Sequence, residues 1–195
     1  MGEMQIKTIG MQELIWLNSI LGGGAIPGVV MKRPLMYEED AYVQDTLQKL
    51  EADGWIDEKR QLTFAGNLYA RILKDYKNSS VHLEIQELQI ALLKDYRLCI
   101  YVNKLENAVQ MFYIDRLSIL HILEDAYLRQ NGLRSNSQMQ LELKKYRNQK
   151  PCANHRFYGK NSKIYLWDNQ LHQETECDED TVYKWIQKYL EIEEE

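Results

Sequence analysis

The sequence predicts an α+β fold: an antiparallel β-sheet flanked by helices, with an embedded winged-helix-like unit of helix, ribbon and helix. Apolar residues recur with helical spacing through much of the first 80 residues and again near the C-terminus. Between these regions, apolar and polar side chains alternate as they do in strands. We therefore expect one domain over residues 1–195, made of a helical, winged-helix-like part (1–80) and a sheet with helices (81–195).

The first helix is expected to run from Thr8, a candidate N-cap, to Leu21, because its apolar residues follow helical spacing. A glycine-rich segment, 22–28, comes next. A phosphate-binding loop would need a Gly-Lys-Ser/Thr sequence after these glycines, and the chain continues with other residues, 29–32. We interpret the segment as a helix stop followed by a loop.

Residues 41–73 predict the winged-helix-like unit. The first helix carries an apolar stripe at i, i+4 and i+7, formed by Val43, Leu47 and Leu50. Gly54 stands where a glycine commonly ends a helix, and two short extended pieces, 55–56 and 61–62, flank a polar turn. Thr63 is the expected N-cap of the second helix, which should turn two apolar residues inward, Leu68 and Ile72.

The charge of this unit argues against DNA recognition. Residues 38–60 hold eight acidic and three basic side chains, a net charge of −5. A face that enters the major groove needs several Lys or Arg contacts to phosphates, and an acidic face repels them. We therefore expect a protein-binding or scaffolding role for this unit, and no nucleic-acid partner.

A meander of about four strands is expected next. The strands should cover residues 81–85, 89–93, 97–102 and 108–114, with a five-residue hairpin loop at 103–107. Both faces of the last hairpin carry apolar residues, with Leu98, Ile100 and Val102 expected on one face and Tyr101, Met111 and Tyr113 on the other. Helices should cover one face of the sheet, and the second face should be covered or reserved for a partner.

The remaining elements follow from caps and apolar stripes. Asp115 is the expected N-cap of a helix that ends near Gly132, with four residues inward: Ile119, Ile122, Leu123 and Ala126. Residues 139–146 are expected to be partly helical, and residues 163–167 should form a strand. A final helix should cover residues 178–190, with an inward stripe of Val182, Trp185, Ile186 and Tyr189.

Composition places the chain among ordinary globular proteins, with 195 residues and a net charge of −5. It has no apolar run of about 18 residues and no basic-then-apolar start, so we expect a cytoplasmic protein without a membrane partner. Three cysteines at unrelated spacings, Cys99, Cys152 and Cys177, indicate free thiols.

Charges are also distributed unevenly. Residues 134–163 hold eight basic side chains and one acidic side chain, a net charge of +7, and residues 174–195 hold nine acidic and two basic side chains, a net charge of −7. The basic stretch could bind a partner or nucleic acid. Because the whole chain is negative, we favour mutual neutralisation of the two stretches on adjacent surfaces.

Residue patterns for catalysis are missing from the sequence. The histidines (His82, His121, His155 and His172) have no second ligand at the spacings typical of metal sites. No G-x-S-x-G nucleophile motif occurs. We therefore expect no catalytic residue, no bound metal and no cofactor, and a binding role in place of an enzymatic one.

The order of elements resembles one known family. A first helix ends at a short leucine-glycine-proline loop, the pattern L-x-x-L-x-x-x-G-W-I-D-x-x-x-x-L-T covers residues 47–63, and a V-H-L-E-I strand and a meander follow. Over about residues 8–125 this looks like the N-terminal half of EspG proteins, the cytosolic chaperones of type VII (ESX) secretion, and their shorter Firmicutes relatives. The chain is shorter than EspG, and its second half does not repeat the first.

The resemblance implies a non-enzymatic chaperone that binds helical-hairpin substrates of the secretion system. If it holds, the apolar tip of a substrate should pack on the hairpin of the sheet, against Tyr101, Leu105, Met111 and Tyr113. Two other function classes remain open: a winged-helix transcription regulator, weakened by the acidic face, and an adaptor or toxin-neutralising protein.

Overall fold

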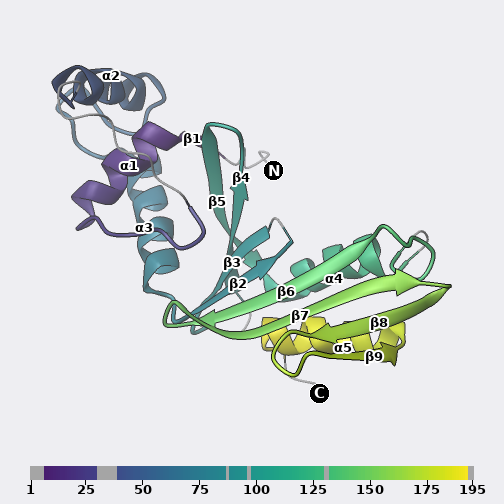
Figure 1. Ribbon diagram of the computed structural model, residues 1–195. Helices are drawn as coiled ribbons and strands as arrows, with labels where there is room; N and C mark the ends of the chain where they lie inside the picture. Colours follow the sequence, from purple (N-terminus) through teal and green to yellow (C-terminus); the bar gives the residue numbers. More distant parts are fainter. Residues whose placement is uncertain (1–6, 30–38, 87, 96–97, 130–131, 193–195) are drawn as a thin grey trace. The chain divides into compact units, whose positions relative to one another are not determined.

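The computed structural model describes residues 7–29, 39–86, 88–95, 98–129 and 132–192 (Figure 1). The helices are α1 (Met11–Ile20), α2 (Glu39–Ala52), α3 (Phe64–Asn78), α4 (Arg116–Tyr127) and α5 (Glu179–Leu190). The strands are β1 (Ile9–Gly10), β2 (Val81–Ile85), β3 (Leu88–Leu92), β4 (Leu98–Lys104), β5 (Ala108–Asp115), β6 (Gln140–Arg147), β7 (Lys150–Lys160), β8 (Lys163–Asp168) and β9 (Gln173–Cys177). Helices flank an antiparallel sheet with strand order β1-β5-β4-β3-β2-β6-β7-β8-β9, which confirms the predicted α+β class.

The chain divides into two compact units. Unit 1 contains residues 1–78 and the tip of the β4–β5 hairpin, Val102–Phe112. Unit 2 contains Ser79–Tyr101 and Tyr113–Glu195. The two units meet in the chain between residues 78 and 79, and the hairpin tip belongs to the helical unit.

Unit 1 packs its helices on the hairpin tip and on β1. The Tyr69 hydroxyl of α3 donates a hydrogen bond to the Val109 carbonyl oxygen over 3.2 Å, and Ile9 of β1 pairs with Val109. This pairing makes the prediction of Thr8 as an N-cap wrong: Ile9 and Gly10 form a strand, so α1 begins at Met11.

The predicted helix, ribbon and helix are present as α2, a single bridge between Ile56 and Leu62, and α3. Thr63 caps α3 as expected, since its Oγ1 accepts from the Gly66 amide over 3.2 Å. Gly66 is required because a Cβ there would lie 2.1 Å from the Trp55 carbonyl oxygen. Leu68, however, is 45% exposed, so the prediction that it points inward is wrong.

The glycine-rich segment is a helix stop and loop, as predicted. Gly22, Gly23 and Gly24 have positive φ angles of 92°, 65° and 88°. Side chains from two helices hold this loop: Asn18 Nδ2 donates to the Gly24 carbonyl oxygen over 2.8 Å, and Lys77 Nζ donates to the Gly23 carbonyl oxygen. The lysine is engaged within the fold and is not presented to a phosphate.

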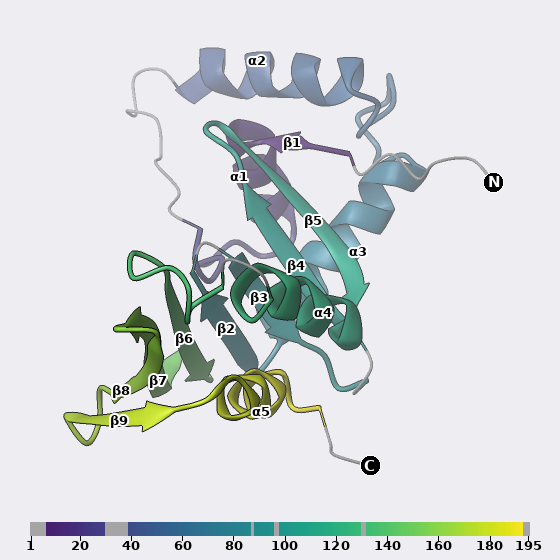
Figure 2. The same cartoon turned by 90° about the vertical axis from the view of Figure 1, so that its right-hand side faces the viewer.

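Unit 2 builds its core on one face of its sheet. Figures 1 and 2 show α4 and α5 on the same side of β2 and β6. The shared core contains residues from both helices and from alternate strand positions, among them Leu83, Ile85, Leu143, Phe157, Ile119, Leu123, Val182 and Ile186. Ile122 is 51% exposed and Ala126 is also exposed, so the predicted inward stripe of α4 is only partly correct.

A buried arginine joins three parts of unit 2. Arg116 of α4 is 1% exposed, and its guanidinium donates to the carbonyl oxygens of Leu93 (2.7 Å), Leu190 (3.0 Å) and Leu98 (3.3 Å). These oxygens belong to the residue that follows β3, the last residue of α5 and the first residue of β4. Five donors in one rigid fork allow a single side chain to serve several acceptors.

The second half of unit 2 contains more strands than predicted. Residues 139–146 are not helical; they contribute to β6, which pairs with β2 and β7. Strands β7 and β9 were not expected. Basic side chains of residues 134–163 form ion pairs with acidic side chains of residues 174–195, as expected. Arg134 pairs with Glu179 (2.6 Å), and Lys145 and Arg147 pair with Glu191 (2.8 and 3.4 Å).

Candidate protein-binding site

The hairpin that carries the predicted binding residues has longer strands and a shorter loop than expected. Strand β4 continues to Lys104 and β5 begins at Ala108, so three residues connect them in place of five. The Leu105 amide donates to the Ala108 carbonyl oxygen over 2.9 Å, and the Met11 amide donates to the Asn107 carbonyl oxygen over 3.0 Å. The start of α1 therefore holds the turn in place.

The hairpin does not place all predicted residues on one face. Asn103 Nδ2 donates to Gln110 Oε1 over 3.0 Å, so these two side chains share a face. Side chains alternate along a strand, which puts Tyr101 on the face of Asn103 and places Met111 and Tyr113 on the opposite face. The predicted grouping of Tyr101 with Met111 and Tyr113 is wrong for this reason.

Exposure separates the predicted residues further. Leu105, at the turn, is 43% exposed, whereas Met111 is 2% exposed and belongs to the buried core. Tyr101 and Tyr113 are half-buried, and Tyr101 packs against the core of unit 2. Burial raises the pKa of Tyr101 above its ordinary value of 10.0. Of the four predicted residues, Leu105 is therefore the one most available to a partner.

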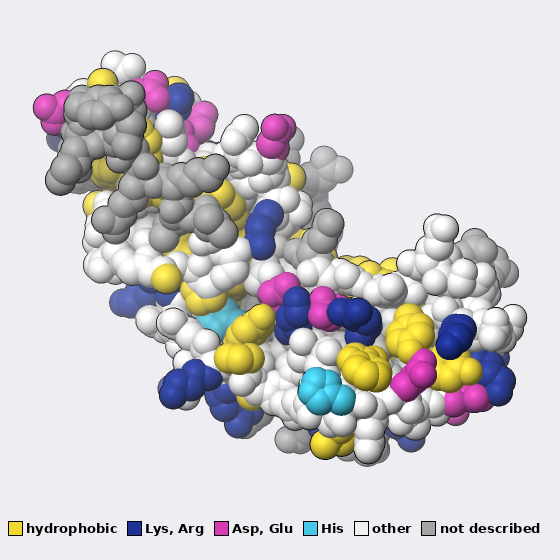
Figure 3. Space-filling model, in the orientation of Figure 1, with side chains coloured by type: hydrophobic (Ala, Val, Ile, Leu, Met, Phe, Trp, Pro, Cys, Tyr) yellow, Lys and Arg dark blue, Asp and Glu magenta, His cyan; other side chains and the backbone are white. Residues whose placement is uncertain are grey.

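A polar surface lies on the face of the unit 2 sheet opposite α4 and α5. Four charged side chains form a connected row across β2, β6 and β7 (Figure 3). Lys144 Nζ lies 3.2 Å from Glu84 Oε1 and 3.1 Å from Glu142 Oε2, and Arg156 Nη2 lies 3.6 Å from Glu142 Oε1. These two acidic and two basic side chains neutralise one another, so the row presents no net positive charge to a nucleic acid.

Aromatic rings extend this face over β7 and β8. Tyr158 and Tyr165 are opposite each other in the strand register and stack with ring centroids 6.0 Å apart. Trp167 lies opposite Arg156, and its Nε1 donates to Asn169 Oδ1 over 2.9 Å. The Tyr158 hydroxyl donates to the Glu174 carboxylate, which holds the ring in one orientation. Sequence reasoning missed this set because β7 was not predicted.

The core face of the same strands holds a buried histidine cluster. His155 Nδ1 lies 2.7 Å from the Tyr189 hydroxyl oxygen, Nε2 lies 3.6 Å from Asp168 Oδ2, and the Trp185 ring centroid is 4.0 Å away. We assign the neutral Nε2–H tautomer, in which Nδ1 accepts from Tyr189 and Nε2–H faces Asp168. Burial lowers the pKa of His155 below 6.5, and the nearby Asp168 carboxylate opposes that shift.

This cluster predicts a pH dependence of stability. The unfolded chain takes up a proton at His155 near its ordinary pKa, whereas the folded protein takes it up only at lower pH, so the free energy of unfolding falls as pH drops through this window. We expect His155→Gln, which keeps hydrogen-bonding groups but cannot titrate, to lose less stability between about pH 7 and about pH 5. Thermal melts of both proteins across this pH range measure the loss of stability. An equal dependence of the melting temperature on pH in the two proteins would contradict the assignment.

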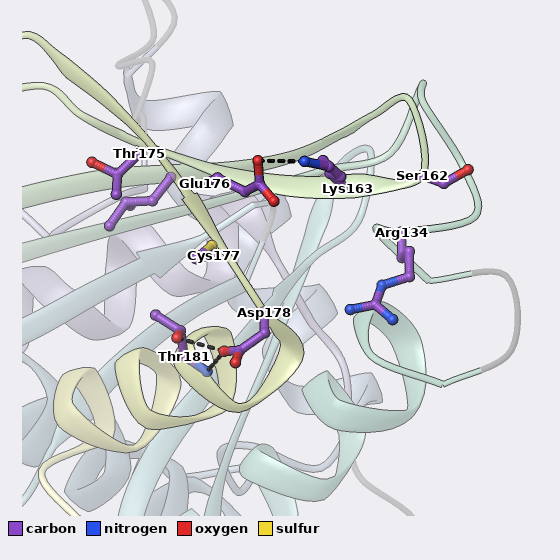
Figure 4. A pocket seen from close by; sticks show the side chains of 9 residues that line it. Arg134, Ser162, Lys163, Thr175, Glu176, Cys177, Asp178 and Thr181 are labelled. Atoms are coloured by element: carbon purple, nitrogen blue, oxygen red, sulfur yellow. Dashed lines mark hydrogen bonds and ion pairs between the residues drawn. The ribbon is translucent and has the colours of Figure 1, made fainter.

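The pocket in Figure 4 lies at the start of α5 and has a volume of about 580 Å³. Its walls combine Leu166, Thr175 and Cys177 with charged residues. The charges are already paired: Lys163 with Glu176 over 2.8 Å, and Arg134 with Glu179, which follows the N-cap Asp178. A free amide at the start of α5 already has a partner within the helix cap, because Asp178 Oδ1 accepts a hydrogen bond from the Thr181 amide over 2.8 Å.

All three cysteines are free, as predicted. Cys99 is buried in β4, and burial raises its pKa to about 12. Cys177 lines the pocket, and burial raises its pKa to about 11. Neither thiol has the lowered pKa that a nucleophilic cysteine needs at neutral pH. Cys152 is exposed on β7.

The sequence matches one family over nearly its whole length. Residues 3–194 match the family described as Domain of unknown function (DUF5081). No curated protein matches the chain. In the parts of the chain that the structure describes, no helix is both long enough and apolar enough to cross a membrane.

Proposed function

The chain belongs to the DUF5081 family, and we propose that it is a non-enzymatic protein-binding protein, a cytoplasmic chaperone of the EspG type. Its partner would be a helical-hairpin substrate of type VII secretion, kept soluble by contact with the β4–β5 hairpin. The support from the sequence is the resemblance of residues 8–125 to the N-terminal half of EspG proteins.

One structural observation carries the proposal: a large apolar side chain, Leu105, is exposed at the turn of the β4–β5 hairpin. Of the seven such side chains among the described residues, four lie in unit 1: Ile20, Phe64, Leu68 and Leu105. Leu105 stands at a turn that hydrogen bonds hold to the start of α1. An apolar side chain on a fixed turn can enter a partner's pocket with little loss of conformational freedom, which favours tight binding.

Charge supports a protein partner over DNA. Among the exposed side chains of residues 40–60, six are acidic (Asp40, Asp45, Glu51, Asp53, Asp57 and Glu58) and three are basic (Lys49, Lys59 and Arg60). Lys49 is engaged with Asp45 over 2.7 Å, which leaves the helix–ribbon–helix segment acidic. DNA binding depends on neutralising phosphates, so this segment would repel a duplex.

A charge at the hairpin turn tests the proposal. We expect Leu105→Asp to abolish co-purification with a co-expressed type VII substrate of helical-hairpin form, because the carboxylate would have to be desolvated in the interface. Leu171→Asp is the matched control: Leu171 is 66% exposed at the turn between β8 and β9 of unit 2 and should keep full binding. Circular dichroism should show both variants folded. Normal binding by folded Leu105→Asp would contradict the proposed site.

A further inference from the structure

Strand β9 leaves one edge of the unit 2 sheet open. It pairs with β8 on one side and is the last strand in the order of the described strands. Among the described residues, no hydrogen bond reaches the backbone of β9 from its other side. Residues 173–176 are exposed and Cys177 is half-buried. Backbone N–H and C=O groups along such an edge are a template for one more strand.

The β9 edge lacks features that commonly prevent a further strand from pairing. Proline, lysine and β-bulges are typical of protected edges. Strand β9 contains neither proline nor lysine, and its five residues pair with β8 in continuous register. A bulge does occur farther inside the sheet, at Lys145 and Tyr146 of β6. An extended backbone can therefore lie along the whole length of β9.

The pocket of Figure 4 adjoins this edge. Thr175 lies opposite Leu166 in the strand register, and Cys177 lies opposite Ile164, a residue of the buried core. Residues 175–177 and Leu166 all line the pocket. The charged residues of its lining are two basic and two acidic: Arg134, Lys163, Glu176 and Asp178. A pocket with balanced charges and apolar walls favours an uncharged, apolar side chain.

A second copy of the chain does not suit the β9 edge. Antiparallel pairing of two β9 strands about Thr175 would set Glu174 of each copy opposite Glu176 of the other. A shift of the centre to either glutamate would set that glutamate opposite itself. Like charges that are directly opposite destabilise a strand pair. The edge therefore favours a strand of another sequence, without acidic residues opposite Glu174 and Glu176.

We propose that the β9 edge and the adjoining pocket bind an extended segment of a partner protein. The segment adds to the sheet as a strand beside β9 and places an apolar side chain in the pocket. Its apolar residues alternate with uncharged or basic residues. In such recognition, backbone hydrogen bonds supply affinity and side-chain pockets supply specificity. This inference goes beyond the proposed chaperone function, because it needs neither the hairpin turn nor a secretion substrate.

A pair of synthetic peptides provides the probe. The first is an end-blocked heptapeptide of alternating leucine and lysine, whose leucines share one face when it is extended. The second has the same sequence with N-methyl groups on two adjacent central amides, which blocks one donor on each edge. We expect the first to bind the full chain in a fluorescence anisotropy titration and the second to bind at least about tenfold more weakly. Equal affinities, or no binding of the first peptide, would overturn the proposal.

Two lysine variants test the role of the pocket. Thr175→Lys and Gln173→Lys add the same charge to exposed residues on the same face of β9, but only Thr175 lines the pocket. We expect Thr175→Lys to bind the first peptide at least about tenfold more weakly than Gln173→Lys. Circular dichroism and melting should stay unchanged in both variants, because both replaced side chains are exposed. Equal affinities of the two variants would contradict the proposed use of the pocket.

Hydrogen–deuterium exchange with the first peptide separates this inference from the proposed function. Exchange should slow at residues 173–177 and stay unchanged at residues 103–109, and Leu105→Asp should bind the peptide like the wild type. Protection of residues 103–109 without protection of 173–177 would place the peptide on the hairpin and overturn the β9 site. Failure of the wild-type chain to bind a secretion substrate, with intact peptide binding, would instead reject the chaperone proposal and leave the β9 site standing.

Discussion

Replacing Arg116 with methionine is expected to destabilise unit 2 by about 3–5 kcal/mol, a large part of a typical domain's stability. Arg116 is buried, and its guanidinium serves the carbonyl oxygens of Leu93, Leu98 and Leu190. A methionine fills similar volume but donates no hydrogen bond, and each buried acceptor that loses its donor costs about 1–3 kcal/mol. Denaturant unfolding of the variant and the wild type measures the difference.

Arg129→Met is the matched control for that prediction. Arg129 lies just after the end of α4, and its side chain is 64% exposed and pairs at the surface with Asp125 over 2.8 Å. Exposed ion pairs contribute about 0–1 kcal/mol, so this variant should unfold near the wild-type midpoint. Similar small losses for both arginines would show that Arg116 does not hold the ends of β3, β4 and α5 together.

The second large effect is expected for Met111→Asp. Met111 is 2% exposed on β5 in the core of unit 1. The substitution removes buried apolar surface and places a carboxylate there, and we expect a loss of about 3–5 kcal/mol, comparable to the largest truncations of buried side chains. The expected observation is a strongly lowered melting temperature or no cooperative transition.

Leu105→Asp provides the contrast within the same hairpin. Because Leu105 is 43% exposed at the turn, the melting temperature of this variant should stay close to that of the wild type. Two apolar-to-aspartate changes six residues apart should therefore have opposite signatures: one unfolds the protein, and the other removes binding. A wild-type melting curve for Met111→Asp would show that β5 does not have the described burial.

The sequence was most informative where a cap or a turn residue left no alternative. Asp115 and Asp178 begin α4 and α5 because their side chains accept the amides of Leu117 and Thr181, a pattern that is local in sequence. Thr63 likewise begins α3 as its expected N-cap. Alternation also predicted β2, whose Val81, Leu83 and Ile85 all face the core.

Predictions failed where neighbours from distant segments decide the structure. The stretch 139–146 has a mixed pattern, and pairing with β2 and β7 makes it a strand. Strand β7 escaped detection because both of its faces carry large side chains: His155 and Phe157 are buried, while Arg156 and Tyr158 lie on the other face. Leu68 and Ile122 fit apolar stripes, but the helices turn them to solvent.

The candidate site shows the same limit. Leu105 was predicted from its place in a hairpin loop, which is a local feature, and it is exposed there. The face of Tyr101 depends on which residues oppose each other across β4 and β5. In the structure Leu105 pairs with Ala108 and Asn103 contacts Gln110, whereas the expected five-residue loop would place Val102 opposite Ala108. The two registers differ by an odd number of residues, and this difference changed which side chains share a face.

Hydrogen–deuterium exchange tests the central claim, that the hairpin turn binds a secretion substrate, most directly. The purified protein would be compared alone and with a purified type VII substrate of helical-hairpin form. We expect slower exchange around the turn at residues 103–109, and unchanged exchange at the turn between β8 and β9, residues 169–172. Unchanged exchange at residues 103–109 in a mixture that forms a complex would contradict it.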